Sequence, residues 1–125
     1  GQMHVRISTE NATPIHAVAV ALESRDDDMS LDHAVSVSCD LIAIREGILE
    51  QLRERLAGKL EGLDPNKIFL NATHTHTGPL TRESSRYNLP ETGLMRPDVY
   101  VEFLIDKLTE AVTESWNSRL PGKMG

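Results

Sequence analysis

The chain has 125 residues, a formal net charge of -6 at pH 7 and 39% hydrophobic residues. This length allows one domain with a buried core, and the acidic balance argues against nucleic acids and anionic membranes as partners. No apolar run approaches the roughly 20 residues that a transmembrane helix needs. The single cysteine, Cys39, cannot form an internal disulfide, and we expect it to be a small buried residue because it lies in an apolar run.

The first half of the chain predicts two strands. Residues 15–22 alternate small and aliphatic side chains and indicate a strand that is buried on both faces or nearly so. The acidic and polar stretch 23–30 is expected to be a loop. Residues 34–40 carry β-branched side chains at alternate positions, which favours the return strand of a wide hairpin.

A helix and a third strand follow. The apolar residues between positions 44 and 60 recur with a helical period, which predicts an amphipathic helix; they are Ile44, Ile48, Leu49, Leu52, Leu56 and Leu60. A turn cluster at 62–66 ends this helix, and residues 67–71 supply the strand. The order strand, helix, strand indicates a βαβ unit with parallel strands.

The last third predicts a long loop at 77–95 and a second helix from Pro97 to about Ser118, with Phe103 and Trp116 in the core. The fold class is therefore α/β: a small sheet with a βαβ unit, three strands and two main helices. Because residues 120–125 form a turn signal that normally leads into another strand, we expect residues 1–125 to be a single partial domain, a fragment of a larger α/β domain.

Two histidines, His74 and His76, stand two residues apart at the end of the third strand. Side chains at i and i+2 of an extended chain point the same way, and imidazole is a common zinc ligand. A Gly-Pro pair at Gly78 and Pro79 then stops the strand. A catalytic zinc site takes three protein ligands and one water, so a further ligand lies elsewhere in this chain or outside it.

Asp40 closes the second strand, so it should lie at the same sheet edge as His74. Two interpretations stay open: a carboxylate that orients a liganding imidazole, and a turn or N-cap residue before the helix. Among the other histidines, His33 belongs at the opposite end of the sheet and His4 lies in no clear element. His16 is a weaker candidate ligand, because the start of the first strand should lie beside the end of the second.

A family resemblance is carried by Val37-Ser38-Cys39-Asp40-Leu41, the helix, Leu63-Asp64-Pro65-Asn66-Lys67-Ile68 and, above all, Ala72-Thr73-His74-Thr75-His76-Thr77-Gly78-Pro79. These segments resemble the N-terminal catalytic region of the neutral/alkaline, non-lysosomal ceramidases and their bacterial relatives. The order of elements is similar from about Ile15 to Trp116.

The resemblance implies a zinc-dependent amidase that cleaves ceramide, an N-acylsphingosine, into sphingosine and a fatty acid. It implies that His74 is a zinc ligand and that His76 lies at the catalytic centre near the substrate carbonyl. The family's other ligands, a histidine, a glutamate and a tyrosine, come from much later in a longer chain. The expected partner is thus a lipid-like N-acyl amide, and the resemblance suggests a secreted or periplasmic protein.

Two alternatives remain from the sequence. One is a metal-dependent phosphoesterase or amidohydrolase of the barrel type, in which an H-x-H pair also ends a strand, usually the first. The other is a non-catalytic truncated domain that self-associates through exposed sheet edges.

Overall fold

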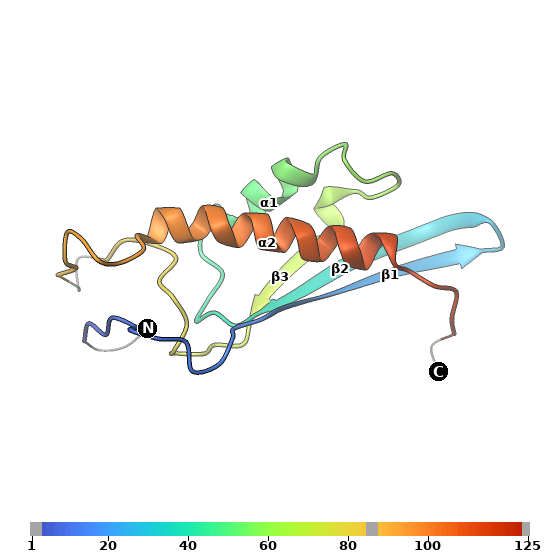
Figure 1. The fold of residues 1–125 in the computed structure, drawn as a ribbon. Coiled ribbons are helices and arrows are strands. Elements are labelled where there is room, and N and C mark those ends of the chain that lie inside the picture. The colour runs from blue at the N-terminus through green and yellow to red at the C-terminus, as the bar shows by residue number, and fades with distance from the viewer. Residues whose placement is uncertain (1–3, 85–87, 124–125) are drawn as a thin grey trace.

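The computed structural model describes residues 4–84 and 88–123 (Figure 1). The elements are β1 (Ala17–Asp26), β2 (Met29–Cys39), α1 (Ile48–Leu56), the 3-10 turn η1 (Pro65–Lys67), β3 (Ile68–Ala72) and α2 (Pro97–Asn117). They build one mixed sheet in the order β1-β2-β3, in which β1 is antiparallel and β3 parallel to β2. The predicted α/β fold, with three strands, two main helices and a β2-α1-β3 unit, is confirmed.

Both helices lie on the same side of the sheet (Figure 1). Alternate residues of the central strand face them, because side chains along a strand point to opposite faces in turn. The core therefore combines every second residue of β2 with apolar stripes of the helices; its fully buried members include Val35, Val37, Ile68, Leu52, Leu108 and Val112. Cys39 and Trp116 are buried as predicted, at 1% and 4% exposure.

Phe103 does not belong to this core, and its side chain is 50% exposed. It directly precedes the buried Leu104 in α2, and one helical step turns a side chain by about 100°. The predicted core position of Phe103 is therefore wrong.

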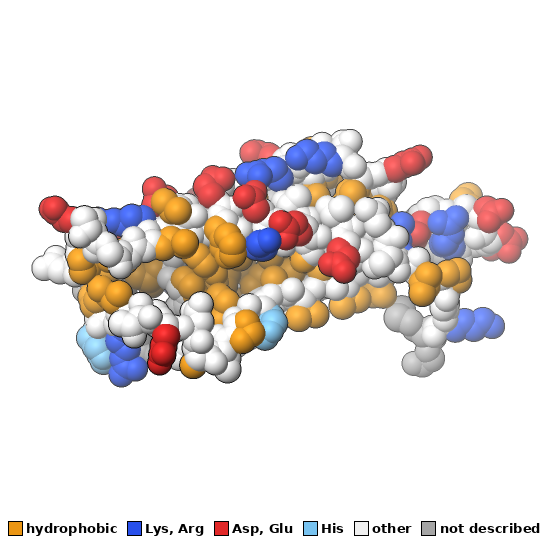
Figure 2. All heavy atoms as spheres, viewed as in Figure 1, with side chains coloured by type: hydrophobic (Ala, Val, Ile, Leu, Met, Phe, Trp, Pro, Cys, Tyr) orange, Lys and Arg blue, Asp and Glu red, His pale blue; other side chains and the backbone are white. Residues whose placement is uncertain are grey.

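The prediction that β1 is buried on both faces is also wrong. Its alanines pack against the core, whereas Val18, Val20 and Leu22 point to the other face of the sheet and are 60%, 51% and 47% exposed. Figure 2 shows hydrophobic side chains along the lower margin, in the region where Figure 1 places the strands, and charged side chains over the helices. The alternation arises because the helices cover only one side of the sheet.

The predicted loop at 23–30 is instead the tip of a tight hairpin. Strand pairing continues to Asp26 and Met29, and Asp27 takes a left-handed conformation at φ 48°, which aspartate tolerates better than most residues. The Arg25 guanidinium bonds the Glu23 carboxylate at 3.0 Å and the Asp28 carbonyl at 2.6 Å. Backbone pairing and these polar contacts form the tip, although few of its side chains are apolar.

Helix α1 is shorter than the predicted 44–60 segment. Glycines in left-handed conformation flank it, Gly47 at φ 86° and Gly58 at φ 69°, and such residues commonly sit where helices start or stop. Ile44 and Leu60 still pack against the core from outside the helix. By contrast, β3 and α2 begin and end within one residue of the prediction.

The expected loop at 77–95 contains no helix or strand in its described part, and residues 85–87 lie outside that part. The expected C-terminal turn is described only as far as Lys123, again without helix or strand. Neither helix of the described ranges is long and apolar enough to cross a membrane.

Candidate metal centre

Three segments meet where β2 and β3 end. Cys39 and Ala72 are the last paired residues of the two strands, and the Thr73 N–H continues the pairing by donating to the Cys39 carbonyl at 2.9 Å. On the other side, the Asp40 N–H donates to the carbonyl of His16 at 2.9 Å. The sheet thus brings the segments before His74, after Cys39 and before Ala17 to one edge, as the topology predicted for Asp40 and His74.

The two histidine rings lie together, although the backbone between them is not extended. β3 ends at Ala72, and His74 has a left-handed φ of 65°. The Nε2 atoms of His74 and His76 are 3.4 Å apart, and the ring planes cross at 82°. Both residues are exposed. The rings therefore meet through a turn in the chain, while the predicted reason, an extended strand, is wrong.

A backbone carbonyl selects the tautomer of His74. Its Nδ1 lies 2.8 Å from the carbonyl oxygen of Ile42, and a carbonyl can only accept. Nδ1 therefore carries the proton, and in the neutral ring Nε2 carries the lone pair. A backbone carbonyl in this position is a usual partner of a metal-binding histidine. The nitrogen that faces His76 is thus the one available to a ligand.

The spacing of the two Nε2 atoms fits one tetrahedral ion. Zinc–imidazole bonds of about 2.0–2.1 Å and a tetrahedral angle place two ligand nitrogens roughly 3.3–3.4 Å apart, and the observed separation is 3.4 Å. Within the described ranges, however, no group of three or more His, Cys, Asp or Glu side chains could hold a metal ion. The chain's described part supplies a pair of donors.

Asp40 does not contact His74. Its carboxylate accepts the N–H of His16 at 2.9 Å and the hydroxyl of Thr73 at 3.2 Å, and its Oδ2 lies 3.5 Å from Nδ1 of His16. The His16 N–H, and after it the Thr73 hydroxyl, hold the pKa of Asp40 below its ordinary value. The Ile42 carbonyl takes the place at His74 Nδ1, and the imidazole that lies beside the Asp40 carboxylate is that of His16. Asp40 is not the N-cap of α1, since Gly47 occupies that position, but it lies in the bend that follows β2 and leads toward the helix, as the turn interpretation predicted.

The neighbouring Cys39 is not a metal donor in this arrangement. Its side chain faces the core, and burial raises the pKa of the thiol to about 11, so it stays protonated and a poor ligand. Of the other histidines, His33 lies far along β2 and contacts Trp116, and His4 accepts a hydrogen bond from Arg6. His16 lies at the same sheet edge as the pair, with its ring 3.5 Å from the Asp40 carboxylate.

Two residues that shape the centre were not predicted. Ile42 acts through its backbone, which leaves no signal in the amino-acid sequence. Gly78 was interpreted only as part of a strand stop, but a Cβ at this position would lie 2.9 Å from the Asp40 carbonyl oxygen. The turn that carries the histidines therefore packs directly against the turn that follows β2.

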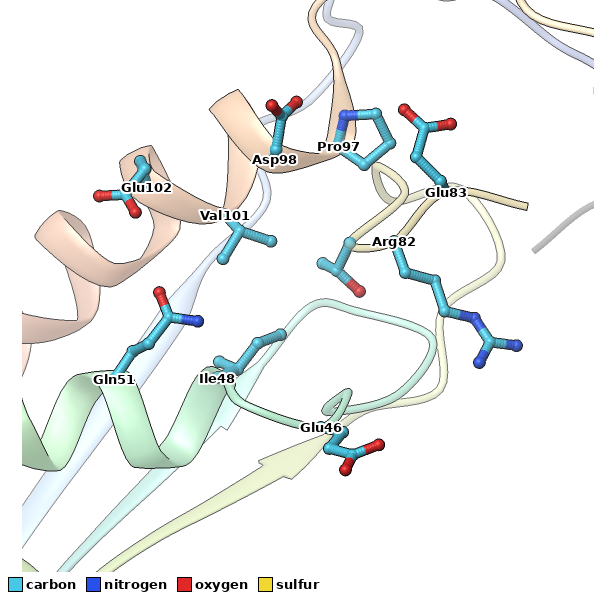
Figure 3. Close-up of a pocket in the computed structure, with 10 residues that line it drawn as sticks. Glu46, Ile48, Gln51, Arg82, Glu83, Pro97, Asp98, Val101 and Glu102 are labelled. Atoms are coloured by element: carbon cyan, nitrogen blue, oxygen red, sulfur yellow. The ribbon is translucent and has the colours of Figure 1, made fainter.

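A separate hollow of about 310 Å³ lies between the first turns of α1 and α2 and the loop after Leu80. It is lined by Glu46, Ile48, Gln51, Thr81, Arg82, Glu83, Pro97, Asp98, Val101 and Glu102. Figure 3 shows Ile48 and Val101 facing the space between the helices, with the carboxylates of Asp98 and Glu83 pointing away from it. The hollow does not include the histidine pair.

Comparison of the chain with protein-family models, with curated proteins and with solved structures found no match.

Proposed function

We propose that this chain carries part of the metal centre of a zinc-dependent amide hydrolase that resembles the neutral ceramidases. The observation that carries the proposal is the 3.4 Å approach of the His74 and His76 Nε2 atoms, together with the 2.8 Å contact from His74 Nδ1 to the Ile42 carbonyl. This pair of contacts leaves a lone pair on an exposed imidazole and fixes its direction. The substrate class, an N-acylsphingosine, comes from the motif resemblance.

In this proposal His74 binds zinc through Nε2, with its ring held by Ile42. A zinc ion, when bound, supplies Lewis acidity and lowers the pKa of a coordinated water. His76 stands beside the ligand nitrogen of His74, where an imidazole N–H can donate to the oxygen of a reacting carbonyl. The two rings thus have separate tasks, one at the metal and one at the substrate.

The proposal also requires donors beyond this pair. With His74 as the ligand from this chain, a catalytic zinc ion is two protein ligands short of the usual three, and the described residues contain no group of three or more donors that could complete the set. We propose that the remaining ligands come from a longer protein of which this chain is a part. The 125-residue chain by itself is then expected to bind zinc weakly and to show no turnover.

The test is hydrolysis of a ceramide by the longer protein, with its zinc content measured in parallel. His74→Ala should remove both the zinc and the activity, whereas His76→Ala should retain zinc and lose activity. Wild-type activity in the His74→Ala protein would refute the assignment. Hydrolysis of a generic phosphate ester without amide hydrolysis would favour the phosphoesterase alternative.

A non-catalytic chain that self-associates is the second candidate. It is favoured by the exposed sheet face, where Val18, Val20, Leu22 and Phe69 are 47–60% exposed. Among the described residues, β1 and β3 are also the two outer strands of the sheet, and outer strands can pair with another chain. Analytical ultracentrifugation of the 125-residue chain separates the two candidates. A dimer that dissociates on Val20→Lys and binds no zinc would favour self-association over the hydrolase.

A further inference from the structure

Asp40 contacts two segments at the end of the sheet that carries the histidine pair, and the partner of the His74 ring at Nδ1 is the Ile42 carbonyl. The Oδ1 of Asp40 accepts from the Thr73 hydroxyl at 3.2 Å, directly before His74. Its Oδ2 accepts from the His16 N–H at 2.9 Å, where the chain enters β1. One carboxylate therefore ties together two segments that are far apart in the sequence.

The backbone of Asp40 makes a further contact with the same turn. Its carbonyl oxygen lies so close to Gly78 that a Cβ there would be 2.9 Å away. The Cys39 carbonyl accepts from Thr73 N–H at 2.9 Å, and the Ile42 carbonyl accepts from the His74 ring at 2.8 Å. Residues 39–42 thus contact the turn that carries the two histidines at three positions: Thr73, His74 and Gly78.

The left-handed conformation of His74 needs this support. A non-glycine residue at φ 65° stores backbone strain, and such strain persists where the surrounding contacts over-determine the conformation. Thr73 and Gly78 bracket the strained residue, and Asp40 holds the first through its side chain and meets the second through its carbonyl.

We propose that Asp40 is a positioning residue for the histidine pair. Asp40 acts through Thr73 and the 39–42 turn, and not through a hydrogen bond of its own to the His74 ring. This inference rests on the proposed zinc function. Asp40 keeps the Ile42 carbonyl in line with His74 Nδ1, and thereby keeps Nε2 of His74 directed at the metal position. Direct hydrogen-bond partners of a metal-binding histidine, here the Ile42 carbonyl, are worth about 10-fold to 100-fold in metal affinity, so loss of Asp40 should cost an amount at the lower end of that range.

The test compares Asp40→Ala with Asp32→Ala in the 125-residue chain. Asp32 is a matched control, because it is an exposed carboxylate of β2 that also accepts a backbone N–H, that of His33 at 2.8 Å, but lies toward the other end of the strand. Zinc affinity is measured by competition with a chelating dye. We expect a loss of about 10-fold for Asp40→Ala and no change for Asp32→Ala.

A second readout does not depend on zinc. Long-range proton–nitrogen NMR of the metal-free chain, at a pH where the rings are neutral, should show His74 with its proton on Nδ1. Asp40→Ala should convert it to a mixture of tautomers, and Asp32→Ala should leave it unchanged. If wild type binds no zinc, the proposed function fails, and this readout still decides whether Asp40 positions the ring.

Should Asp40→Ala fail to fold by circular dichroism, Thr73→Val removes one of its two bonds and takes its place. Thr73→Ser keeps the hydroxyl and should restore both the zinc affinity and the tautomer. An unchanged His74 tautomer in a folded Asp40→Ala or Thr73→Val chain would overturn the inference.

Discussion

Two histidines at opposite ends of the sheet, His33 and His74, use the same side chain in different ways. At the hairpin end, the Nε2 of His33 accepts the Asp64 N–H at 2.9 Å, and the ring meets Trp116 edge-on at 5.1 Å between centroids. At the other end, His74 meets His76 at 5.0 Å, also edge-on. Its bond to the protein backbone is made by Nδ1, and Nε2 faces the second ring.

The difference teaches which histidine is available to a ligand. His33 is half-buried, and the lone pair of its Nε2 already accepts a backbone N–H, so a metal ion would have to break that bond. His74 is exposed, and its Nε2 meets the exposed ring of His76 at 3.4 Å, so a metal ion there would replace a contact between two side chains and leave the backbone bond of Nδ1 intact. The spacing between the aromatic rings is similar at the two sites and does not distinguish them. They differ in the nitrogen that bonds the backbone, which is Nε2 in His33 and Nδ1 in His74.

The largest effect is expected at the hairpin end. Trp116 is 4% exposed and donates from Nε1 to the Glu61 carbonyl at 3.1 Å. Trp116→Ala should lower the free energy of unfolding by about 3–5 kcal/mol, measured by urea denaturation. Zinc affinity of the protein that remains folded should not change. A loss of zinc binding in that folded protein would show that the two ends are not independent.

Replacement of each histidine should separate the roles of the two ends. His74→Ala should weaken zinc binding on the order of 100-fold, about 2.7 kcal/mol, because it removes the proposed zinc ligand. His33→Ala should leave zinc affinity unchanged and cost about 1 kcal/mol of stability, since it removes one hydrogen bond and a ring contact. Both quantities come from a dye competition assay and a denaturation curve. Equal zinc losses in the two variants would contradict the comparison.

A methyl group at Gly78 should perturb the structure at the end of the sheet that carries His74 and His76. Gly78→Ala places a Cβ 2.9 Å from the Asp40 carbonyl oxygen, and relief of such overpacking costs about 1–3 kcal/mol. The tautomer of His74, read by NMR, should change as well. Gly122→Ala is the control, because a Cβ there meets nothing within 4 Å. If both variants match wild type, the contact between the two turns has no structural importance.

Acid should lower the stability of the fold slightly, through carboxylates at both ends of the sheet. The pKa of Glu23 is lowered chiefly by a hydrogen bond from Ser30, that of Asp32 by one from Lys67, and that of Asp40 by the His16 N–H. A carboxyl whose pKa is lower in the folded chain stabilises it fully above the unfolded value, here 3.8 or 4.5, and less as the pH falls through the folded value. The thermal unfolding midpoint should therefore decrease as the pH is lowered below about 4.5. This decrease should be smaller in Asp40→Asn. A midpoint that rises on acidification would show the opposite sign of linkage.

Periodicity in the sequence predicted the parts of the fold that a single chain's pattern determines. The 21 residues of α2 and the 5 of β3 carry clear signals and were predicted to within one residue at each end. The hairpin tip was missed because its side chains are polar and its structure depends on backbone pairing. The exposed face of β1 was missed because an apolar run does not reveal whether a second layer covers it.

The candidate site was predictable in its residues and not in its geometry. The H-x-H motif indicated that His74 and His76 would meet, and they do. The left-handed backbone of His74 and the contact with Ile42, 32 residues away, depend on how two turns pack. A contact to a backbone carbonyl involves no particular side chain, so residue types alone could not reveal it. The metal role of the pair stays a prediction.

The most direct test of the comparison is a zinc titration of the 125-residue chain, followed by the ring nitrogen signals of His74 and His33 in long-range NMR spectra. We expect the Nε2 signal of His74 to shift progressively as zinc is added and to level off in excess zinc, while the signals of both His33 nitrogens stay unchanged. A titration that shifts His33 and leaves His74 unchanged would contradict this expectation.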